Sequence, residues 1–461
     1  MKHYDAIVIG AGQAGPGMAI GLAEHGKKVA LIEGNLLGGS CVNYGCTPTK
    51  TLRKSARVLH IAQRANDFGI EVGKISVDFE AVMARVNRIV TNSRNGLRSW
   101  VKGYPDNLDL IEDWASFDGK DGHNFVVNVS EQKLTATHVY LNTGTRASVP
   151  PIEGLSDSPY LDNISLLKLK AVPEHLIILG GSYIGIEMGQ IFRRLGSKVS
   201  IIENSAHLAS REDKDVSEAI EELLNEEGID TYLAHKAQKV THDSKGIHLH
   251  LTGDNGDVMV AGSHLLVAVG RVPNTDTLNA ESVGLKLDER GYIPTNGKFE
   301  TNVKGIWALG DINKRGAFTH TSYQDYEIAL ANLAGEKRSA DGRIMAYAMY
   351  SDPPMGRVGM TEKEARESGK NVLMAKYRMT DVSRAKEESE TTGLIKLLVD
   401  ADTEECLGAC VFGIGGDEIV QIFSNYMAAK GKYSTMMNAL PVHPTVAEFI
   451  PTILAKLKLL E

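Results

Sequence analysis

The stretch AIVIGAGQAGPGMAIGLAEHGKKVALIE, residues 6–33, is the part of the sequence from which the fold can be predicted. It reads as a strand over 6–9, a glycine turn, a helix to about residue 25 and a second strand over 28–32. In such a unit Gly10 allows the tight turn, Gly12 lets the backbone approach a pyrophosphate, and Gly15 lets helix and strand pack closely. Glu33 follows the second strand, where a carboxylate accepts from a ribose hydroxyl. The stretch therefore predicts a dinucleotide-binding unit with its phosphates at the helix N-terminus.

The pattern returns 170 positions later as LIILGGSYIGIEMGQIFRRLGSKVSIIE, residues 176–203. Its outer glycines and its terminal acid fall on the corresponding positions, Gly180, Gly185 and Glu203. Ser182 replaces the middle glycine, which predicts a slightly less close approach of the backbone to the phosphates. Two such units imply an α/β chain with two Rossmann-like domains and two bound dinucleotides.

The end of the second unit indicates which nicotinamide nucleotide binds there. Glu203 suits an unmodified ribose and repels a 2′-phosphate, and residues 204–206 offer no cation for such a phosphate. We therefore expect NADH rather than NADPH. Arg211 lies near enough in the sequence to keep NADPH as an alternative.

Composition and charge narrow the class of protein. The chain has 461 residues, of which 43% are hydrophobic and 23% charged, so we expect two to four domains. Its formal net charge is −8, with scattered cations, so neither nucleic acid nor a membrane is expected as a partner. Glycines and Gln13 interrupt the apolar N-terminal run and disfavour a signal peptide. With four cysteines, far too few for a disulfide scaffold, we expect a cytoplasmic protein.

A second motif, GGSCVNYGCTPTK at residues 38–50, contains Cys41 and Cys46. Metal binding by the pair is disfavoured, because no second ligand pair follows at zinc spacing and Cys406 and Cys410 lie in a remote strand-like segment. Free cysteines are usually buried and inert, so a purely structural role for Cys41 and Cys46 remains an alternative. However, Cys46 stands at a predicted helix start, one turn before Lys50, and both features favour a thiolate. The motif thus favours a redox pair.

A redox dithiol beside a dinucleotide unit suggests that one of the dinucleotides is a flavin, the usual relay between hydride and thiol chemistry. The cysteine motif, and the sequence of essentially the whole chain, resemble the flavin-dependent pyridine nucleotide-disulfide oxidoreductases. Glutathione reductase, dihydrolipoamide dehydrogenase and mercuric reductase belong to that family. The resemblance implies an α/β fold with an FAD domain, an NAD domain and an α+β C-terminal dimerisation domain.

The resemblance also implies roles for particular residues. FAD would be held by the first glycine motif and Glu33, and its ribityl chain by Asp311 in TNVKGIWALGD. Lys50 would lie beside the flavin and pair with Glu187 near the nicotinamide. The segments LNTGTRASVP (141–150) and VAVGRVPN (267–274) resemble the crossings between domains. Further cofactor-binding positions implied by the family are Gly39, Thr143, Gly144, Gly270 and Arg271.

In the family, electrons pass from NADH through the flavin to Cys46, the charge-transfer thiol, while Cys41 is the interchange thiol that attacks the substrate. VHPTVAEF near the C-terminus resembles the motif whose histidine, here His443, serves as acid and base. Glu448 would orient that histidine. Because the histidine normally comes from the partner subunit, the resemblance implies a homodimer with shared active sites.

Within the family, the sequence is most similar to mercuric-reductase-like flavoproteins. The chain nevertheless ends in ILAKLKLLE, without the C-terminal cysteine pair of true mercuric reductase. No metal site is expected, because a soft metal needs thiolates to hand it inward and none remain except Cys41 and Cys46. Dihydrolipoamide dehydrogenase is the main alternative; glutathione reductase is weaker, since Asn204 and Ser210 replace its nucleotide-reading arginines. A third reading is a sensor or scavenger of oxidants that shows no sustained turnover.

We divide the chain accordingly into four segments. An FAD domain over 1–150 is followed by an NAD(P) domain over 151–275. The chain returns to the FAD domain over 276–342 and ends in a dimerisation domain over 343–461. The substrate would be a small molecule or a disulfide, and no residue pattern identifies it.

Overall fold

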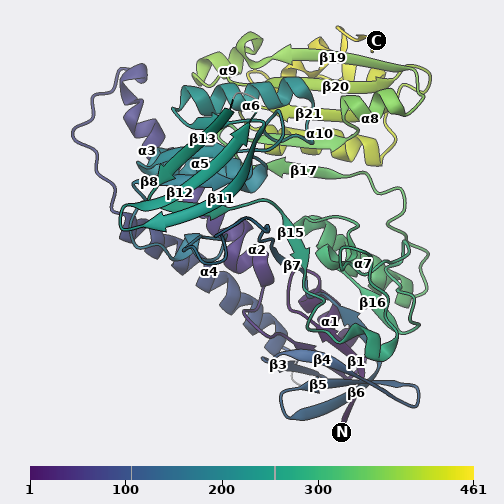
Figure 1. Ribbon diagram of the computed structural model, residues 1–461. Helices are drawn as coiled ribbons and strands as arrows, with labels where there is room; N and C mark the ends of the chain where they lie inside the picture. The colour runs from purple at the N-terminus through teal and green to yellow at the C-terminus, as the bar shows by residue number, and fades with distance from the viewer. Residues whose placement is uncertain (105, 254–255, 461) are drawn as a thin grey trace.

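The protein has three layered parts (Figure 1), seen in a computed structural model that describes residues 1–104, 106–253 and 256–460. In that view the first sheet, with the N-terminus, lies at the bottom and the second nucleotide-binding unit lies to the left. The C-terminal sheet lies at the top, with the C-terminus. The predicted fold class, two Rossmann-like units followed by an α+β domain, is confirmed by these sheets.

The first unit is a seven-stranded sheet in the order β3-β2-β1-β6-β5-β4, with β16 paired to β6. Strands β1, β2, β3, β6 and β16 run parallel, whereas β4 and β5 form an antiparallel extension. Its elements are β1 (Lys2–Ile9), α1 (Gly15–Glu24), β2 (Val29–Ile32), β3 (Leu108–Ile111), β4 (Ala115–Asp121), β5 (Asn124–Val129), β6 (Gln132–Leu141) and β16 (Ile306–Ala308). Because β16 joins from far along the chain, this domain is built from two separate segments.

The second unit repeats that arrangement as a four-stranded parallel sheet in the order β10-β9-β8-β14. A three-stranded antiparallel sheet, β11-β12-β13, accompanies it. The elements are β8 (His175–Leu179), α5 (Tyr183–Leu195), β9 (Lys198–Ile202), α6 (Lys214–Glu226), β10 (Asp230–Tyr232), β11 (His235–Asp243), β12 (Gly246–Gly253), β13 (Gly256–Gly262) and β14 (His264–Val267). The repeat read from the glycine spacing is therefore a repeat of structure.

Two short strands mark where the chain passes between the units. β7 (Thr145–Ala147) pairs with β15 (Arg271–Pro273) in an antiparallel two-stranded sheet. The two segments that the sequence pattern marks as crossings therefore run side by side. The domain boundaries at residues 150, 275 and 342 stay a prediction.

The C-terminal part is a six-stranded sheet in the order β17-β18-β21-β20-β19-β22, and every pairing in it is antiparallel. Every residue of β20 and β21 is buried. The elements are β17 (Ala346–Met349), β18 (Met355–Gly359), α8 (Glu362–Glu367), β19 (Val372–Arg378), α9 (Ser383–Glu387), β20 (Leu394–Asp400), β21 (Cys406–Phe412), α10 (Gly416–Ala428), α11 (Tyr433–Met437), α12 (Ile450–Leu454) and β22 (Lys458–Leu459).

The remaining helices connect the three parts. They are α2 (Gly39–Tyr44), α3 (Cys46–Gln63), α4 (Phe79–Lys102) and α7 (Thr319–Leu333), with short 3₁₀ turns η1 (Ala65–Phe68), η2 (Leu166–Lys168), η3 (Ala280–Val283), η4 (Gly310–Asn313), η5 (Met379–Asp381) and η6 (Ala447–Phe449). One core cluster joins Leu52 of α3, Val86 of α4, Ile186 of α5 and Phe412 of β21. Burying such side chains stabilises each by about 1.5–3 kcal/mol, so α3 is fixed where the second unit and the C-terminal sheet meet. Within the described chain, no helix combines the length and apolar character that crossing a membrane requires.

Asn142, directly after β6, connects the first glycine turn by hydrogen bonds to the segment that follows β16. Its Oδ1 accepts from the Gly15 backbone N–H at 3.1 Å, and its Nδ2 donates to the Leu309 carbonyl at 2.9 Å. We expect Asn142→Ala to cost about 1–3 kcal/mol, because it leaves two buried backbone groups without partners. The measurement is urea unfolding of the purified protein. Asn302→Ala is the matched control, since Asn302 bridges two backbone groups in the same way at an exposed position. Equal losses in the two variants would contradict the prediction.

Candidate active site

The two cysteines of the 38–50 motif lie on consecutive helices, and one hydroxyl contacts both of them. Cys41 is in α2 and Cys46 is the first residue of α3. Thr319, the first residue of α7, donates from Oγ1 to the Cys41 Sγ at 3.1 Å, and its Oγ1 lies 3.3 Å from the Cys46 Sγ. All four cysteines of the chain are free thiols in the structure. The sequence separates Thr319 from the pair by more than 270 positions, so only the fold brings them together.

The environment distinguishes the two sulfurs. The pKa of Cys46 is lowered to about 6, first by the hydrogen bond from Cys41 and then by Thr319 and the charge of Lys50, against the opposing effect of burial. The pKa of Cys41 is raised, first by the same shared hydrogen bond and then by burial. Because the two sulfurs share one hydrogen bond, negative charge is favoured on Cys46 and the proton is favoured on Cys41.

Lys50, one turn into α3, connects this dithiol to the second nucleotide-binding unit. Its Nζ donates to Glu187 Oε2 in α5 at 2.8 Å and lies 4.4 Å from the centre of the Tyr350 ring. Glu187 has a side chain only 8% exposed, and its other oxygen accepts from the Tyr350 N–H at 2.8 Å. The pairing expected of Lys50 and Glu187 is therefore present in this geometry.

The first glycine motif forms a cradle that fits a dinucleotide. Gly10 has φ +100°, and a Cβ on Gly15 would lie 2.0 Å from the Gly10 carbonyl oxygen, so neither position accepts a side chain. A Cβ on Gly39 would lie 2.8 Å from the Cα of Gly12, which brings two backbone segments together at the N-terminus of α1. Glu33 Oε2 accepts from the Ala11 N–H at 2.7 Å. Free amides, close backbone approach and a carboxylate are what a pyrophosphate and a ribose require.

Asp311 extends this cradle toward the dithiol. It follows β16 in η4, and burial raises the pKa of its carboxyl group. Thr145 donates to its Oδ2 at 3.2 Å, while Arg271 donates from Nε to the Thr145 hydroxyl at 2.7 Å and lies close enough to stabilise the Asp311 carboxylate by its charge. A buried carboxylate with a free lone pair suits a hydroxylated chain such as the ribityl group.

The other cofactor-binding positions implied by the family shape the two crossings. Two hydrogen bonds at Asn274 join the two crossings. The Thr143 hydroxyl donates to the Asn274 carbonyl at 2.9 Å, and the Asn274 N–H donates to the Gly144 carbonyl at 3.0 Å. Gly144 has φ +65° and Gly270 has φ +136°, conformations that favour glycine. These residues hold the crossings in register beside Asp311.

The second glycine motif repeats the first in detail. Gly180 has φ +116°, and a Cβ on Gly185 would lie 1.9 Å from the Gly180 carbonyl oxygen. Glu203 accepts from the Gly181 and Ser205 N–H groups at 2.8 Å each, as Glu33 does in the first unit. Ser182 is the N-cap of α5 in an extended conformation. These contacts fit a second dinucleotide, with Glu203 at the ribose position.

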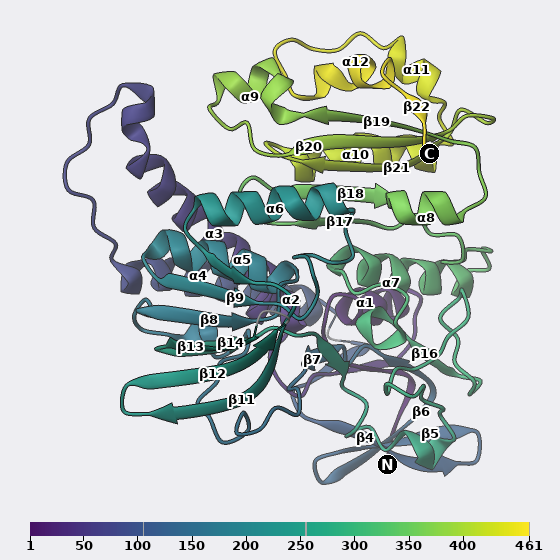
Figure 2. The same cartoon turned by 45° about the horizontal axis from the view of Figure 1, so that its top comes forward.

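His443 and Glu448 meet each other but lie away from this chain's dithiol. His443 Nδ1 lies 2.9 Å from Glu448 Oε2, and the histidine side chain is 76% exposed. The segment between α11 and α12 that carries both residues lies at the outer face of the C-terminal sheet, whereas α2 and α7 lie on the opposite side of that sheet (Figure 2). Within one chain, His443 and Glu448 therefore pair with each other, and the His443 imidazole faces solvent.

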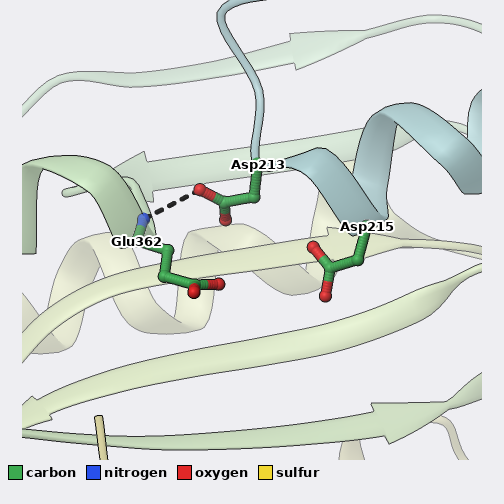
Figure 3. Close-up of side chains that lie close together, drawn as sticks. All are labelled: Asp213, Asp215 and Glu362. Carbon is green, nitrogen blue, oxygen red and sulfur yellow. Dashed lines mark hydrogen bonds between the residues drawn. The ribbon is translucent and has the colours of Figure 1, made fainter. Parts of the chain in front are cut away.

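Three carboxylates elsewhere lie close enough to hold a metal ion. Asp213, Asp215 and Glu362 gather where α6 meets the C-terminal domain (Figure 3). The ammonium group of Lys396, only 1% exposed, lies among them at 3.3, 2.6 and 2.7 Å respectively. Each carboxylate also pairs with a second cation: Asp213 with Arg357, Asp215 with Lys376 and Glu362 with Arg366. These cations already balance the cluster, so it is a structural ion network that joins two domains.

Comparison with known proteins agrees with this geometry. Residues 4–331 match the model of the pyridine nucleotide-disulphide oxidoreductases, and residues 345–453 match the dimerisation domain of the same family. A probable pyridine nucleotide-disulfide oxidoreductase, RclA of Escherichia coli, is 35% identical over 99% of this chain and its own full length. A Staphylococcus aureus mercuric reductase is 32% identical over 90% of this chain and 76% of its own.

Two further similarities cover nearly the whole molecule. A dihydrolipoyl dehydrogenase of Cupriavidus necator is 30% identical over 97% of this chain and 96% of its own. The solved structure of a Cu(II) complex of the HOCl-induced flavoprotein disulfide reductase RclA from Escherichia coli superimposes with a TM-score of 0.88. It is 34% identical in sequence, and the match covers 99% of each chain.

Two nucleotide cradles that converge on a dithiol define a flavoprotein disulfide reductase, and these similarities place it among reductases of the RclA type. The chain belongs to the pyridine nucleotide-disulphide oxidoreductase family, whose members are enzymes that depend on FAD and use a pyridine nucleotide. The dimerisation domain supports a homodimer.

The shared proton of the dithiol predicts how the reduced protein titrates. We expect alkylation of Cys46 by iodoacetamide to rise with a midpoint near pH 6, because its pKa is lowered and the thiolate persists above that pH. Peptide mass spectrometry after alkylation at a series of pH values separates Cys46 from Cys41. Cys41→Ala removes the largest stabilising contact, so it is expected to raise the Cys46 midpoint. A wild-type midpoint between pH 8 and 9 would contradict the assignment.

Proposed function

We propose that the protein is an NADH-dependent disulfide reductase that cycles Cys41 and Cys46 between disulfide and dithiol. The observation that carries this proposal is the dithiol itself. Its thiolate, Cys46, begins the helix whose Lys50 is paired with Glu187 of the nicotinamide-type unit. A structural pair of thiols would need neither a lowered Cys46 pKa nor this ionic connection.

In this proposal the first unit binds FAD through the Gly10–Gly15 turn, Glu33 and Asp311, and the second binds NADH through the Gly180–Gly185 turn and Glu203. Bound in the first cradle, FAD supplies the relay between hydride and thiol chemistry. Lys50 and Glu187 fix the relative position of the two sites. We propose NADH over NADPH because Glu203 is an anion and Asn204 beside it is neutral.

The chain's own residues then divide the thiol chemistry. The hydride from NADH, which carries two electrons and one proton, converts the Cys41–Cys46 disulfide into one thiol, at Cys41, and one thiolate, at Cys46. Cys46 keeps the thiolate charge, stabilised by Cys41, Thr319 and Lys50. Cys41 attacks an acceptor disulfide while its proton passes to a base, and one half of the acceptor leaves as a thiolate that takes up this proton. Cys46 then attacks the Cys41 sulfur, the internal disulfide re-forms, and the other half of the acceptor leaves as a thiolate that is protonated by solvent.

We propose that the base is His443 of the partner subunit. In one chain His443 is paired with Glu448, exposed, and carried on the outer face of the dimerisation domain. Such a dyad is oriented for proton transfer, since a carboxylate at Nδ1 leaves Nε2 to face a substrate or a thiol. Each active site would then be shared between the two subunits.

The acceptor is a small molecule or a disulfide, and relatives suggest two directions for the search. The mercuric-reductase and dihydrolipoyl-dehydrogenase relatives favour metal-thiolate and lipoyl acceptors respectively. The RclA relative, described as HOCl-induced and solved with Cu(II), favours a response to oxidants or metal ions as the second candidate function. We keep the cytoplasm as the proposed location, because Cys46 is exposed and a free, exposed thiol persists in a reducing compartment.

The first experiment is anaerobic titration of the FAD-loaded protein with NADH, and separately with NADPH, while the visible spectrum is recorded. We expect a long-wavelength thiolate-to-flavin band in the wild type and its absence in Cys46→Ser. Cys406→Ser is the matched control, because Cys406 is a buried thiol on β21. Flavin bleaching without the band in every protein would indicate a simple NADH oxidase. A band formed at lower NADPH than NADH concentration would overturn the nucleotide preference.

A mixed dimer tests the shared site. Cys41→Ser and His443→Gln homodimers are each expected to lose at least about 90% of the disulfide reductase activity, since each lacks one reacting group in both sites. In a heterodimer of the two, one site recovers Cys41 from one chain and His443 from the other. Activity should therefore return to about half that of the wild-type dimer. A heterodimer as inactive as its parents would contradict sharing.

A further inference from the structure

Thr319, which contacts both sulfurs, is flanked by two residues that are fixed to another domain. On one side Phe318 stacks on Tyr347 of β17, with ring centres 5.3 Å apart and planes 3° from parallel. On the other side His320 donates from Nε2 to the Ala346 carbonyl at 2.6 Å. The rings of Phe318 and His320 also stack on each other, at 5.5 Å and 11°. The first turn of α7 is thus docked on β17 through both neighbours of Thr319.

Tyr347 is itself held in place by a hydrogen bond to a buried carboxylate. Its hydroxyl donates to Glu212 Oε1 at 2.8 Å, and Arg357 binds the other oxygen of Glu212. The side chains of Glu212 and Arg357 are 0% and 1% exposed. Burial and the Glu212 charge raise the pKa of Tyr347, so its hydroxyl stays protonated and keeps donating. The ring against which Phe318 stacks therefore has one fixed orientation.

The same carboxylate also accepts from Tyr183, the first residue of α5 in the second glycine motif. Glu212 thus fixes at once the start of the nucleotide-binding helix and, through Tyr347 and Phe318, the start of α7. This is a second connection between the nucleotide site and the dithiol. It is separate from the ion pair of Lys50 and Glu187.

We propose that Tyr347, pinned by Glu212, is a positioning residue of the active site: its stack on Phe318 holds the Thr319 hydroxyl between the two redox sulfurs. The proposal rests on the proposed function, in which Cys46 must be held as a thiolate. A hydroxyl that stabilises a thiolate has to lie within hydrogen-bond reach of it, and its single proton is donated to one sulfur at a time. An ionised Cys46 can only accept, so the Thr319 hydroxyl can donate to it across the 3.3 Å contact. Phe318 and His320, the neighbours of Thr319, both contact β17, so the C-terminal domain contributes to that position.

The test measures the titration of Cys46 directly. All variants are made in a Cys41→Ser background, so that Cys46 is the reactive thiol of the site, and its alkylation by iodoacetamide is followed by mass spectrometry against pH. Thr319→Val removes the hydroxyl, so the Cys46 midpoint should rise by about one pH unit, which slows alkylation about tenfold below the midpoint. Tyr347→Leu should reproduce at least half of that rise. The Thr319→Val/Tyr347→Leu combination should be no worse than Thr319→Val alone.

Two control variants separate positioning from general stability. Tyr347→Phe keeps the stacked ring and loses only the bond to Glu212, so it should shift the midpoint less than half as far as Tyr347→Leu. Tyr377→Leu removes a comparable aromatic partner, that of Phe449 at 5.7 Å in the same domain, and should leave the Cys46 midpoint unchanged. Phe318→Leu removes the stack from the other side and takes the place of Tyr347→Leu if that variant does not fold.

The outcomes are distinct. If Thr319→Val shifts the midpoint but neither Tyr347→Leu nor Phe318→Leu does, the stack has no positioning role and the inference is overturned. If Thr319→Val leaves the midpoint in place, the hydroxyl itself is not used and the inference also fails. Alkylation reports the protonation of Cys46 whether or not the protein turns over. Failure of the reductase assay with an intact midpoint shift would therefore count against the proposed function alone.

Discussion

The ion pair between Lys50 and Glu187 is the constraint on which the arrangement of the site depends. Glu187 is nearly buried at the centre of α5, so its charge needs a partner, and removing one partner of such a pair leaves an uncompensated charge. Lys50 satisfies it from α3, the helix that begins with Cys46. One interaction therefore fixes the distance between the nucleotide-binding helix and the redox helix, and it also adds positive charge beside the thiolate.

Around this pair, the two nucleotide cradles follow from backbone sterics more than from side-chain chemistry. In each motif a Cβ on the last glycine would lie about 2 Å from the carbonyl oxygen of the first, at 2.0 Å for Gly15 and 1.9 Å for Gly185. Glycine at these positions lets the helix start directly over the strand end, which is the arrangement in which the N–H groups of a helix's first turn bind phosphates. Ser182 shows that the middle position tolerates a side chain, because the residue there is the N-cap of α5 in an extended conformation.

Sequence patterns predict the parts of the site that are encoded locally. The glycine turns, the terminal carboxylates and the position of Cys46 at a helix start each depend on residues within about 30 positions, so periodicity and spacing were sufficient to predict them. Other contacts of the site join residues that are more than 120 positions apart in the sequence. They are the contacts of Thr319 with Cys41, of Asn142 with Gly15 and of Tyr347 with Glu212, and no local pattern marks them. Thr319 is the clearest example. A threonine at the start of a helix is far too common to identify a residue that contacts both thiols.

The unequal protonation of the dithiol explains why the proposed enzyme needs a second subunit. The contacts that hold Cys46 as a thiolate raise the pKa of Cys41, so the thiol assigned to attack the acceptor is the poorer nucleophile of the two. Cys41 therefore requires a base at the moment of attack, and the described part of this chain places none of its histidines in hydrogen-bond contact with that sulfur. His443, exposed and oriented by Glu448, is a suitable base only if another chain brings it there. In this scheme dimerisation is a chemical requirement that follows from how the two sulfurs share one proton.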